Sequence, residues 1–221
     1  MDVSQLVQTV AIYALPVLFA ITLHEAAHGY VARHFGDMTA FAQGRISLNP
    51  ARHIDLVGTI VVPILILVAS KFLGGAGMLF GWAKPVPVNY SALRRPRQHM
   101  MWVAAAGPGA NLAMALGWAG LLKLADVLPA NYFSQPLLLM GKAGIEVNVI
   151  LMLLNLLPIL PLDGGRILAG LLPVRIAGHY AKLEPWGVPI LLVLLFTSAL
   201  GVILAPMIHF SFRVIGTMFQ L

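Results

Sequence analysis

Apolar residues form long runs along this chain, and polar residues gather in the stretches between the runs. The first run extends from about residue 6 to about residue 35, which is long enough to cross a bilayer with some tilt. Further runs at about 100–126, 138–160 and 186–210 predict additional spans. The pattern therefore predicts an all-α polytopic membrane protein with about four to six transmembrane helices.

One region, 56–93, departs from this pattern. Its first part, 56–69, is apolar but short for a full span. Further along, Pro85 and Pro87 alternate with valines, which excludes helix and favours an extended backbone. Such backbone is tolerated at membrane depth only where protein buries it or where it lines a water-filled cavity.

The composition supports the membrane class. Of the 221 residues, 59% are hydrophobic and only 10% are charged, whereas a soluble domain carries about 25% charged residues. The net charge is +6, but the basic residues lie at the ends of apolar runs and form no stripe with aromatic residues. We therefore expect no nucleic-acid partner, and we expect anionic lipid headgroups to face these charges.

The distribution of Lys and Arg predicts the topology. The loops at 33–55, 84–97 and 163–182 hold 10 of the 14 basic residues, so the positive-inside rule places these loops in the cytoplasm. The region 56–93 must then enter and leave the membrane on the same side, which predicts a re-entrant element with an extended or β part. An ordinary span at 56–73 is the alternative.

The first apolar run contains the motif His24-Glu25-Ala26-Ala27-His28. On a helix, His24 and His28 lie one turn apart on the same face, as two ligands of one tetrahedral zinc require, and Glu25 is placed as the general base. Ionisable residues within lipid are costly unless they serve a function or face a protein interior. The chain has no cysteine, so any metal must be bound by His, Asp or Glu.

A catalytic zinc usually has a third protein ligand, and the acidic residues offer few candidates. Asp163 follows an apolar run at a Pro- and Gly-rich break, so its carboxylate can point back into the helix bundle. The span 138–160 should run in the same direction as the first span, which brings Asp163 toward the depth of the two histidines. Apart from Glu25, the other acidic residues are expected to be surface charges: Asp2, Asp37, Asp55, Asp126, Glu146 and Glu184.

Several motifs together resemble the site-2 protease family of intramembrane zinc metalloproteases, in its compact bacterial and archaeal branch. The resemblance covers roughly residues 20–170, with the motifs in matching order. The motifs are His24-Glu25-x-x-His28, Gly44-Arg45 to Asn49-Pro50, Gly81-Trp82 to Asn89, Gly107-Pro108-Gly109-Ala110-Asn111, and Asn155-x-x-Pro158 to Asp163-Gly164.

The resemblance implies that His24, His28 and Asp163 bind one zinc ion per chain and that Glu25 activates its water. It also implies that Asn155 holds substrate or polarises the site, although an amide within a span can equally hydrogen-bond a neighbouring helix. Gly107 and Asn111 are expected to support the site mainly through helix packing. The chain is too short to add a PDZ or nucleotide-sensing CBS domain to this core, so the means of substrate selection stays open.

We therefore expect one membrane-embedded metalloprotease domain over 1–221, with a catalytic core at about 6–170 and a C-terminal span at about 186–210. It would cleave a transmembrane protein or peptide in regulated intramembrane proteolysis, as a multi-pass cell-membrane protein with its active site toward the cytoplasm. Substrate would pair with an exposed strand edge at Val86, Val88 and Asn89 by β-augmentation. A membrane metal-binding or transport protein without proteolytic activity is the alternative, a catalytically inactive membrane scaffold is a further one, and the oligomeric state is open.

Overall fold

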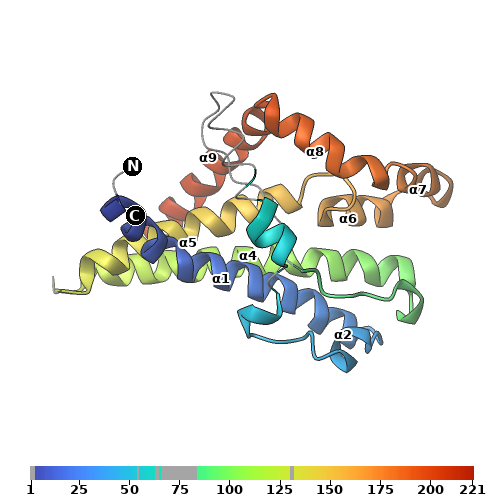
Figure 1. The fold of residues 1–221 in the computed structure, drawn as a ribbon, viewed down its shortest axis with the longest axis horizontal. Coiled ribbons are helices and arrows are strands. Elements are labelled where there is room, and N and C mark those ends of the chain that lie inside the picture. The colour runs from blue at the N-terminus through green and yellow to red at the C-terminus, as the bar shows by residue number, and fades with distance from the viewer. Residues whose placement is uncertain (1–2, 54, 63–64, 66–83, 130–131) are drawn as a thin grey trace.

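The computed structural model describes residues 3–53, 55–62, 65, 84–129 and 132–221, and within these ranges the chain is mostly helical and contains no strand (Figure 1). The glycine-rich part of the expected re-entrant element and the motif residues 81–83 lie outside these ranges. The helices are α1 (Val3–His34), α2 (Thr39–Ala42), α4 (Pro96–Val127), α5 (Ser134–Asn155), α6 (Asp163–Leu171), α7 (Val174–Ala181), α8 (Gly187–Phe196) and α9 (Ala199–Phe219), with a π-helical segment at Leu56–Val61 and 3₁₀ turns at Pro50–Arg52, Tyr90–Ala92 and Glu184–Trp186.

Three long helices, α1, α4 and α5, pack against one another and form the centre of the molecule (Figure 1). Helices α1 and α5 run in the same direction (Figure 1), because Tyr13 of α1 lies beside Glu146 of α5, and farther along α1 His24 lies beside Asp163, which follows the end of α5. Helix α4 packs against both of them and runs in the opposite direction (Figure 1). The prediction that the first span and the span before Asp163 are parallel is therefore confirmed.

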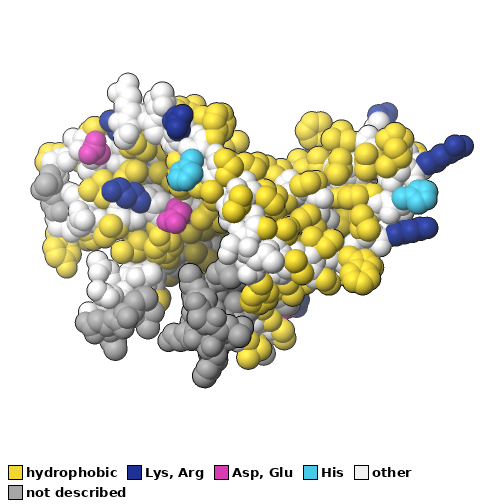
Figure 2. All heavy atoms as spheres, turned by 90° about the horizontal axis from the view of Figure 1, so that it is seen from above, with side chains coloured by type: hydrophobic (Ala, Val, Ile, Leu, Met, Phe, Trp, Pro, Cys, Tyr) yellow, Lys and Arg dark blue, Asp and Glu magenta, His cyan; other side chains and the backbone are white. Residues whose placement is uncertain are grey.

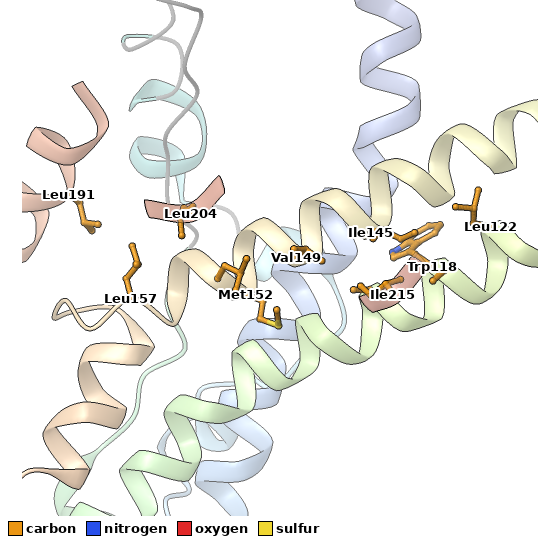
Figure 3. Close-up of a cluster of buried hydrophobic side chains, with 12 residues drawn as sticks. Trp118, Leu122, Ile145, Val149, Met152, Leu157, Leu191, Leu204 and Ile215 are labelled. Carbon is orange, nitrogen blue, oxygen red and sulfur yellow. The ribbon is translucent and has the colours of Figure 1, made fainter. Parts of the chain in front are cut away.

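The main buried apolar cluster joins α4 and α5 and extends to α8 and α9 (Figure 3). Close approach of α4 and α5 depends on Gly144, because a Cβ there would lie 2.2 Å from the ring of Trp118. Any larger residue at this position would separate the two helices. The labelled side chains of the cluster are Trp118, Leu122, Ile145, Val149, Met152, Leu157, Leu191, Leu204 and Ile215.

Among the described residues, three helices are long and apolar enough to cross a membrane: Val7–His34, Ser134–Asn155 and Ala199–Phe219. Helix α4 is as long as α1 but is not one of these three. Its apolar character is interrupted by small and polar residues such as Gly107 and Asn111, which face the other central helices. The expected total of about four to six spans therefore stays a prediction.

The expected C-terminal span at 186–210 is divided instead into α8 and α9. Helix α8 ends where Thr197 donates a hydrogen bond to the carbonyl of Val193 and Ser198 adopts a left-handed backbone with φ of 60°. Helix α9 then continues to Phe219, beyond the predicted end. Two small polar residues are too few to interrupt the hydrophobic pattern, so the sequence did not indicate this break.

Candidate metal centre

Helix α1 places the two histidine side chains side by side. The Nε2 atoms of His24 and His28 are 3.1 Å apart, and their rings meet edge to face with centroids 4.7 Å apart. The residues between them and around them are mostly small or apolar, which allows α1 to pack against α4 at this level. The motif spacing thus produces the shared face that the sequence predicted.

Asp163 is the first residue of α6 and completes a cluster with the two histidines. Its Oδ2 atom lies 3.2 Å from Nε2 of His24 and 3.4 Å from Nε2 of His28. The start of α6 can fold back on the end of α5 only because Gly164 has no side chain, since a Cβ there would lie 2.2 Å from the carbonyl oxygen of Leu156. The Asp-Gly sequence therefore aims the carboxylate at the histidines.

The hydrogen bonds of the imidazoles show that three lone pairs meet at this point. Nδ1 of His24 lies 2.5 Å from Oδ1 of Asn111, and Nδ1 of His28 lies 2.7 Å from the carbonyl oxygen of Val103. Both partners only accept hydrogen bonds, so each Nδ1 carries the proton and each Nε2 is unprotonated in the neutral ring. Oδ2 of Asp163 is also buried and has no hydrogen-bond partner among the described residues.

This convergence fits a metal ion. The candidate ligand atoms lie within 4.8 Å of one another, and tetrahedral zinc with bonds of about 2.0–2.1 Å separates its ligands by roughly 3.4 Å. A cation bound between the two lone pairs would favour the ionised form of the Asp163 carboxyl, which is the form that a metal ligand must take.

Gly107 of α4 provides the space in which the two imidazoles lie. A Cβ at this position would be 2.5 Å from Nε2 of His28 and 2.6 Å from Cε1 and Nε2 of His24. The glycine was expected to serve mainly helix packing. The structure shows that the close contact is with the candidate metal ligands themselves.

Glu25 contacts the extended segment at 84–89. Its Oε2 atom accepts a hydrogen bond of 2.7 Å from the backbone N–H of Val86, which is buried. Residues 84–89 form no helix, as the alternating prolines predicted, and Val86 lies beside α1 next to the metal ligands. That it forms a β element or re-enters the membrane stays a prediction.

Asp37 was expected to be a surface charge, and this expectation is wrong. Its side chain is 0% exposed and accepts hydrogen bonds from the N–H of Thr39 at 2.9 Å and the N–H of Asn89 at 2.6 Å. Asn89 in turn uses its own side chain to accept from the N–H of Ser91. Asp37 therefore holds the far end of the extended segment, and the backbone donor of Asn89 is already occupied.

Glu146 is likewise not a simple surface charge, since Tyr13 donates to it between α1 and α5.

The amides of the site have different surroundings. Asn111 is completely buried and contacts His24, whereas Asn155 donates to the carbonyl of Leu151 in its own helix. Sequence reasoning missed Asn148, a fully buried amide of α5 whose Oδ1 lies 3.0 Å from Nδ2 of Asn111. Asn155 was selected through its resemblance to a family motif, whereas the simpler signal of an amide within an apolar span applies equally to Asn148.

Sequence relatives agree with a metalloprotease assignment. The chain is 40% identical over 200 residues to "Putative zinc metalloprotease YwhC" of Bacillus subtilis, a match covering 88% of this chain and 84% of the relative. It is 31% identical over 188 residues to "Putative zinc metalloprotease Rip2" of Mycolicibacterium smegmatis, covering 83% of this chain and 66% of the relative. It is 28% identical over 208 residues to "Putative zinc metalloprotease Rip2" of Mycobacterium tuberculosis strain H37Rv, and this match covers 92% of this chain and 74% of the relative.

No model of a known protein family and no solved structure matches the chain. The match to the Bacillus protein nevertheless extends over most of both chains. The chain therefore belongs to the family of zinc metalloproteases that includes YwhC and Rip2.

Proposed function

We propose that this protein is an intramembrane zinc endopeptidase of the site-2 protease type, which hydrolyses a peptide bond within or near the transmembrane segment of another protein. The observation that carries the proposal is the convergence of His24, His28 and the buried Oδ2 of Asp163. Two of these residues lie on α1, a helix long and apolar enough to cross a membrane. A soluble protease has no need of such a helix around its motif.

The chemistry is divided between one metal and this chain's own residues. Zinc held by the three ligands would make a water nucleophilic near neutral pH and would polarise the scissile carbonyl. Glu25 is held through Oε2 by the N–H of Val86, so its other oxygen can accept the proton of the attacking water. The same carboxyl group can then deliver this proton to the leaving amine.

The extended segment offers a defined edge for an unwound substrate. Along an extended chain, the N–H and C=O of one residue point to one edge and those of the next residue point to the other. The N–H of Val86 points to Glu25, so Val86 and Val88 share the edge that faces the site. Pro85 and Pro87 have no N–H to offer a substrate, and Arg45 donates to the carbonyls of both Lys84 and Pro85.

Val88 is the residue best placed to pair with a substrate strand. Its N–H has no hydrogen-bond partner within the described part of the chain, whereas the N–H groups of Lys84, Val86 and Asn89 are all occupied. Of the three residues expected to pair with substrate, Val86 and Asn89 already use their N–H groups within the protein. The backbone groups that can pair with a substrate strand are therefore the N–H of Val88 and the carbonyls beside it. Main-chain pairing of this kind would hold a substrate extended next to Glu25.

A matched pair of variants tests this role. Val88→Pro removes the free N–H, and Val88→Ala shortens the side chain but keeps the N–H. We expect Val88→Pro to bind zinc normally and to lose most cleavage of a co-expressed single-span reporter, with Val88→Ala close to the unmodified protein. Equal cleavage by the two variants would exclude pairing through Val88.

The surface supports a cytoplasmic position for the α6–α7 end. Large apolar side chains are exposed there, including Val174 at 73% and Trp186 at 64%, beside the cations Arg175 and Lys182. Figure 2 shows basic side chains protruding among hydrophobic ones at the end where Figure 1 places α7. Apolar residues mixed with basic ones match a membrane interface with anionic headgroups, so we propose that this end lies at the inner face of the cell membrane.

Glu25→Gln tests the enzymatic function as a whole. The substitution preserves the shape of the side chain and its acceptor for the N–H of Val86 but removes the proton acceptor. We expect the variant to keep one zinc per chain and to stop cleaving the reporter. Zinc binding without cleavage by the unmodified protein would instead support a membrane metal-binding or transport protein. Comparison of membrane proteomes from cells with active and Glu25→Gln protein would identify the substrates.

A further inference from the structure

A continuous series of buried hydrogen bonds connects the backbone of α5 to the candidate metal site. Nδ2 of Asn148 donates to the carbonyl of Gly144 at 2.8 Å, and Oδ1 of Asn148 accepts from Nδ2 of Asn111 at 3.0 Å. Oδ1 of Asn111 then faces Nδ1 of His24 at 2.5 Å. Both amide side chains are 0% exposed, so no solvent competes for these bonds.

The direction of every bond in this series is fixed by backbone carbonyls. The carbonyl of Gly144 can only accept, so Asn148 must turn its NH₂ group toward it and its oxygen toward Asn111. The carbonyl of Ala20 also accepts from Nδ2 of Asn111, at 3.3 Å. The oxygen of Asn111 must therefore face His24, whose Nδ1 has to carry the proton, and this leaves Nε2 of His24 unprotonated toward Asp163.

We propose that Asn148 is a positioning residue for the metal, which acts through Asn111 to fix the ring orientation and the tautomer of His24. The inference rests on the proposed metal function of the site and does not depend on the substrate. Ala20 alone would hold Asn111 weakly, because 3.3 Å is long for an N–H···O bond, whereas the Asn148 bond has an ordinary length. Without Asn148, one N–H of Asn111 would be buried without a partner.

Helix packing makes this arrangement possible. Gly144 supplies the accepting carbonyl and, through its missing side chain, also allows α5 to approach α4 at Trp118. Asn155, farther along α5, makes the same type of bond within its own helix, to Leu151, but makes no hydrogen bond to Asn111 or His24 in the described part of the chain. The positioning role thus belongs to Asn148 and not to an amide at any place on α5.

The test compares Asn148→Thr with Asn148→Val, two side chains of nearly equal shape. The Thr hydroxyl can donate to the carbonyl of Gly144, as Thr commonly does four residues back in a helix, and can accept from Asn111. Val can do neither. The measurement is zinc affinity of the full-length protein in detergent, by competition with a chelator, together with ¹⁵N NMR of His24 to identify its protonated nitrogen.

We expect Asn148→Val to weaken zinc binding by about 10-fold, in the range found when outer partners of metal ligands are removed, and to show a mixture of His24 tautomers. Asn148→Thr should recover most of the affinity and the Nδ1-protonated form. Normal affinity in both variants would overturn the proposal, and so would equal losses in both, because that would indicate a packing effect. If the unmodified protein binds zinc but does not cleave, the proposed protease function fails while this comparison still decides the role of Asn148.

Discussion

Gly107→Ala is the most direct test of the metal-site geometry. The added methyl carbon would lie 2.5–2.6 Å from ring atoms of His24 and His28, whereas nonbonded heavy atoms normally approach to about 3.5 Å. At least one ring must therefore move by roughly 1 Å, far more than the tolerance of about 0.2 Å for metal–ligand distances. We expect zinc affinity to fall at least about 100-fold, and cleavage to fall with it, as a misplacement of this size implies.

The fold itself should survive this substitution. Crowding around the added methyl group should lower the free energy of unfolding by about 1–3 kcal/mol. Replacing Gly by Ala within a helix should raise it by about 1 kcal/mol. Gly109→Ala is the matched control, because a Cβ there meets nothing within 4 Å. It should bind zinc and cleave normally, with stability unchanged or up to about 1 kcal/mol higher.

The assay is zinc per chain after equilibrium dialysis of purified protein, with cleavage of a single-span reporter and thermal unfolding measured in parallel. Zinc binding by Gly107→Ala at the affinity of the unmodified protein would refute the account of the site. An equal loss of zinc in Gly109→Ala would show that the helix backbone, and not contact with the imidazoles, controls the metal.

Three further predictions follow from the site. Removal of zinc with a chelator should abolish cleavage, and added zinc should restore it, while circular dichroism stays nearly constant because the apolar cluster of α4 and α5 needs no metal. Asp37→Asn should leave a buried N–H of Thr39 or Asn89 unpaired, at a cost of about 1–3 kcal/mol; hydrogen exchange should rise at 84–89 with zinc content unchanged. Gly164→Ala should reduce zinc binding by moving Asp163, since its Cβ would be 2.2 Å from a backbone oxygen, whereas Gly178→Ala, with open space, should have no effect.

The sequence predicted the parts of this protein that depend on periodicity. Two histidines four residues apart must share a face of any helix, and α1 shows this. The parallel direction of α1 and α5 also followed from charge counting, and it brought Asp163 to the correct depth. The divided C-terminal element was not predicted, because only Thr197 and Ser198 mark the break within an apolar run. A hydrophobic pattern predicts which residues are buried or face lipid, but it does not predict where a single residue changes its backbone φ angle.

The parts of the site that were missed share one physical cause, which is that their partners are backbone groups or other helices. Asp37 accepts a hydrogen bond from the N–H of Asn89, and Glu25 accepts one from the N–H of Val86. Because nearly every residue has a backbone N–H, the sequence does not indicate which of them a carboxylate binds. The two carboxylates thus fix the segment at both ends without using its side chains. It follows that proline at either anchored N–H should release the segment, whereas substitution of the exposed side chain of Lys84 should preserve its position.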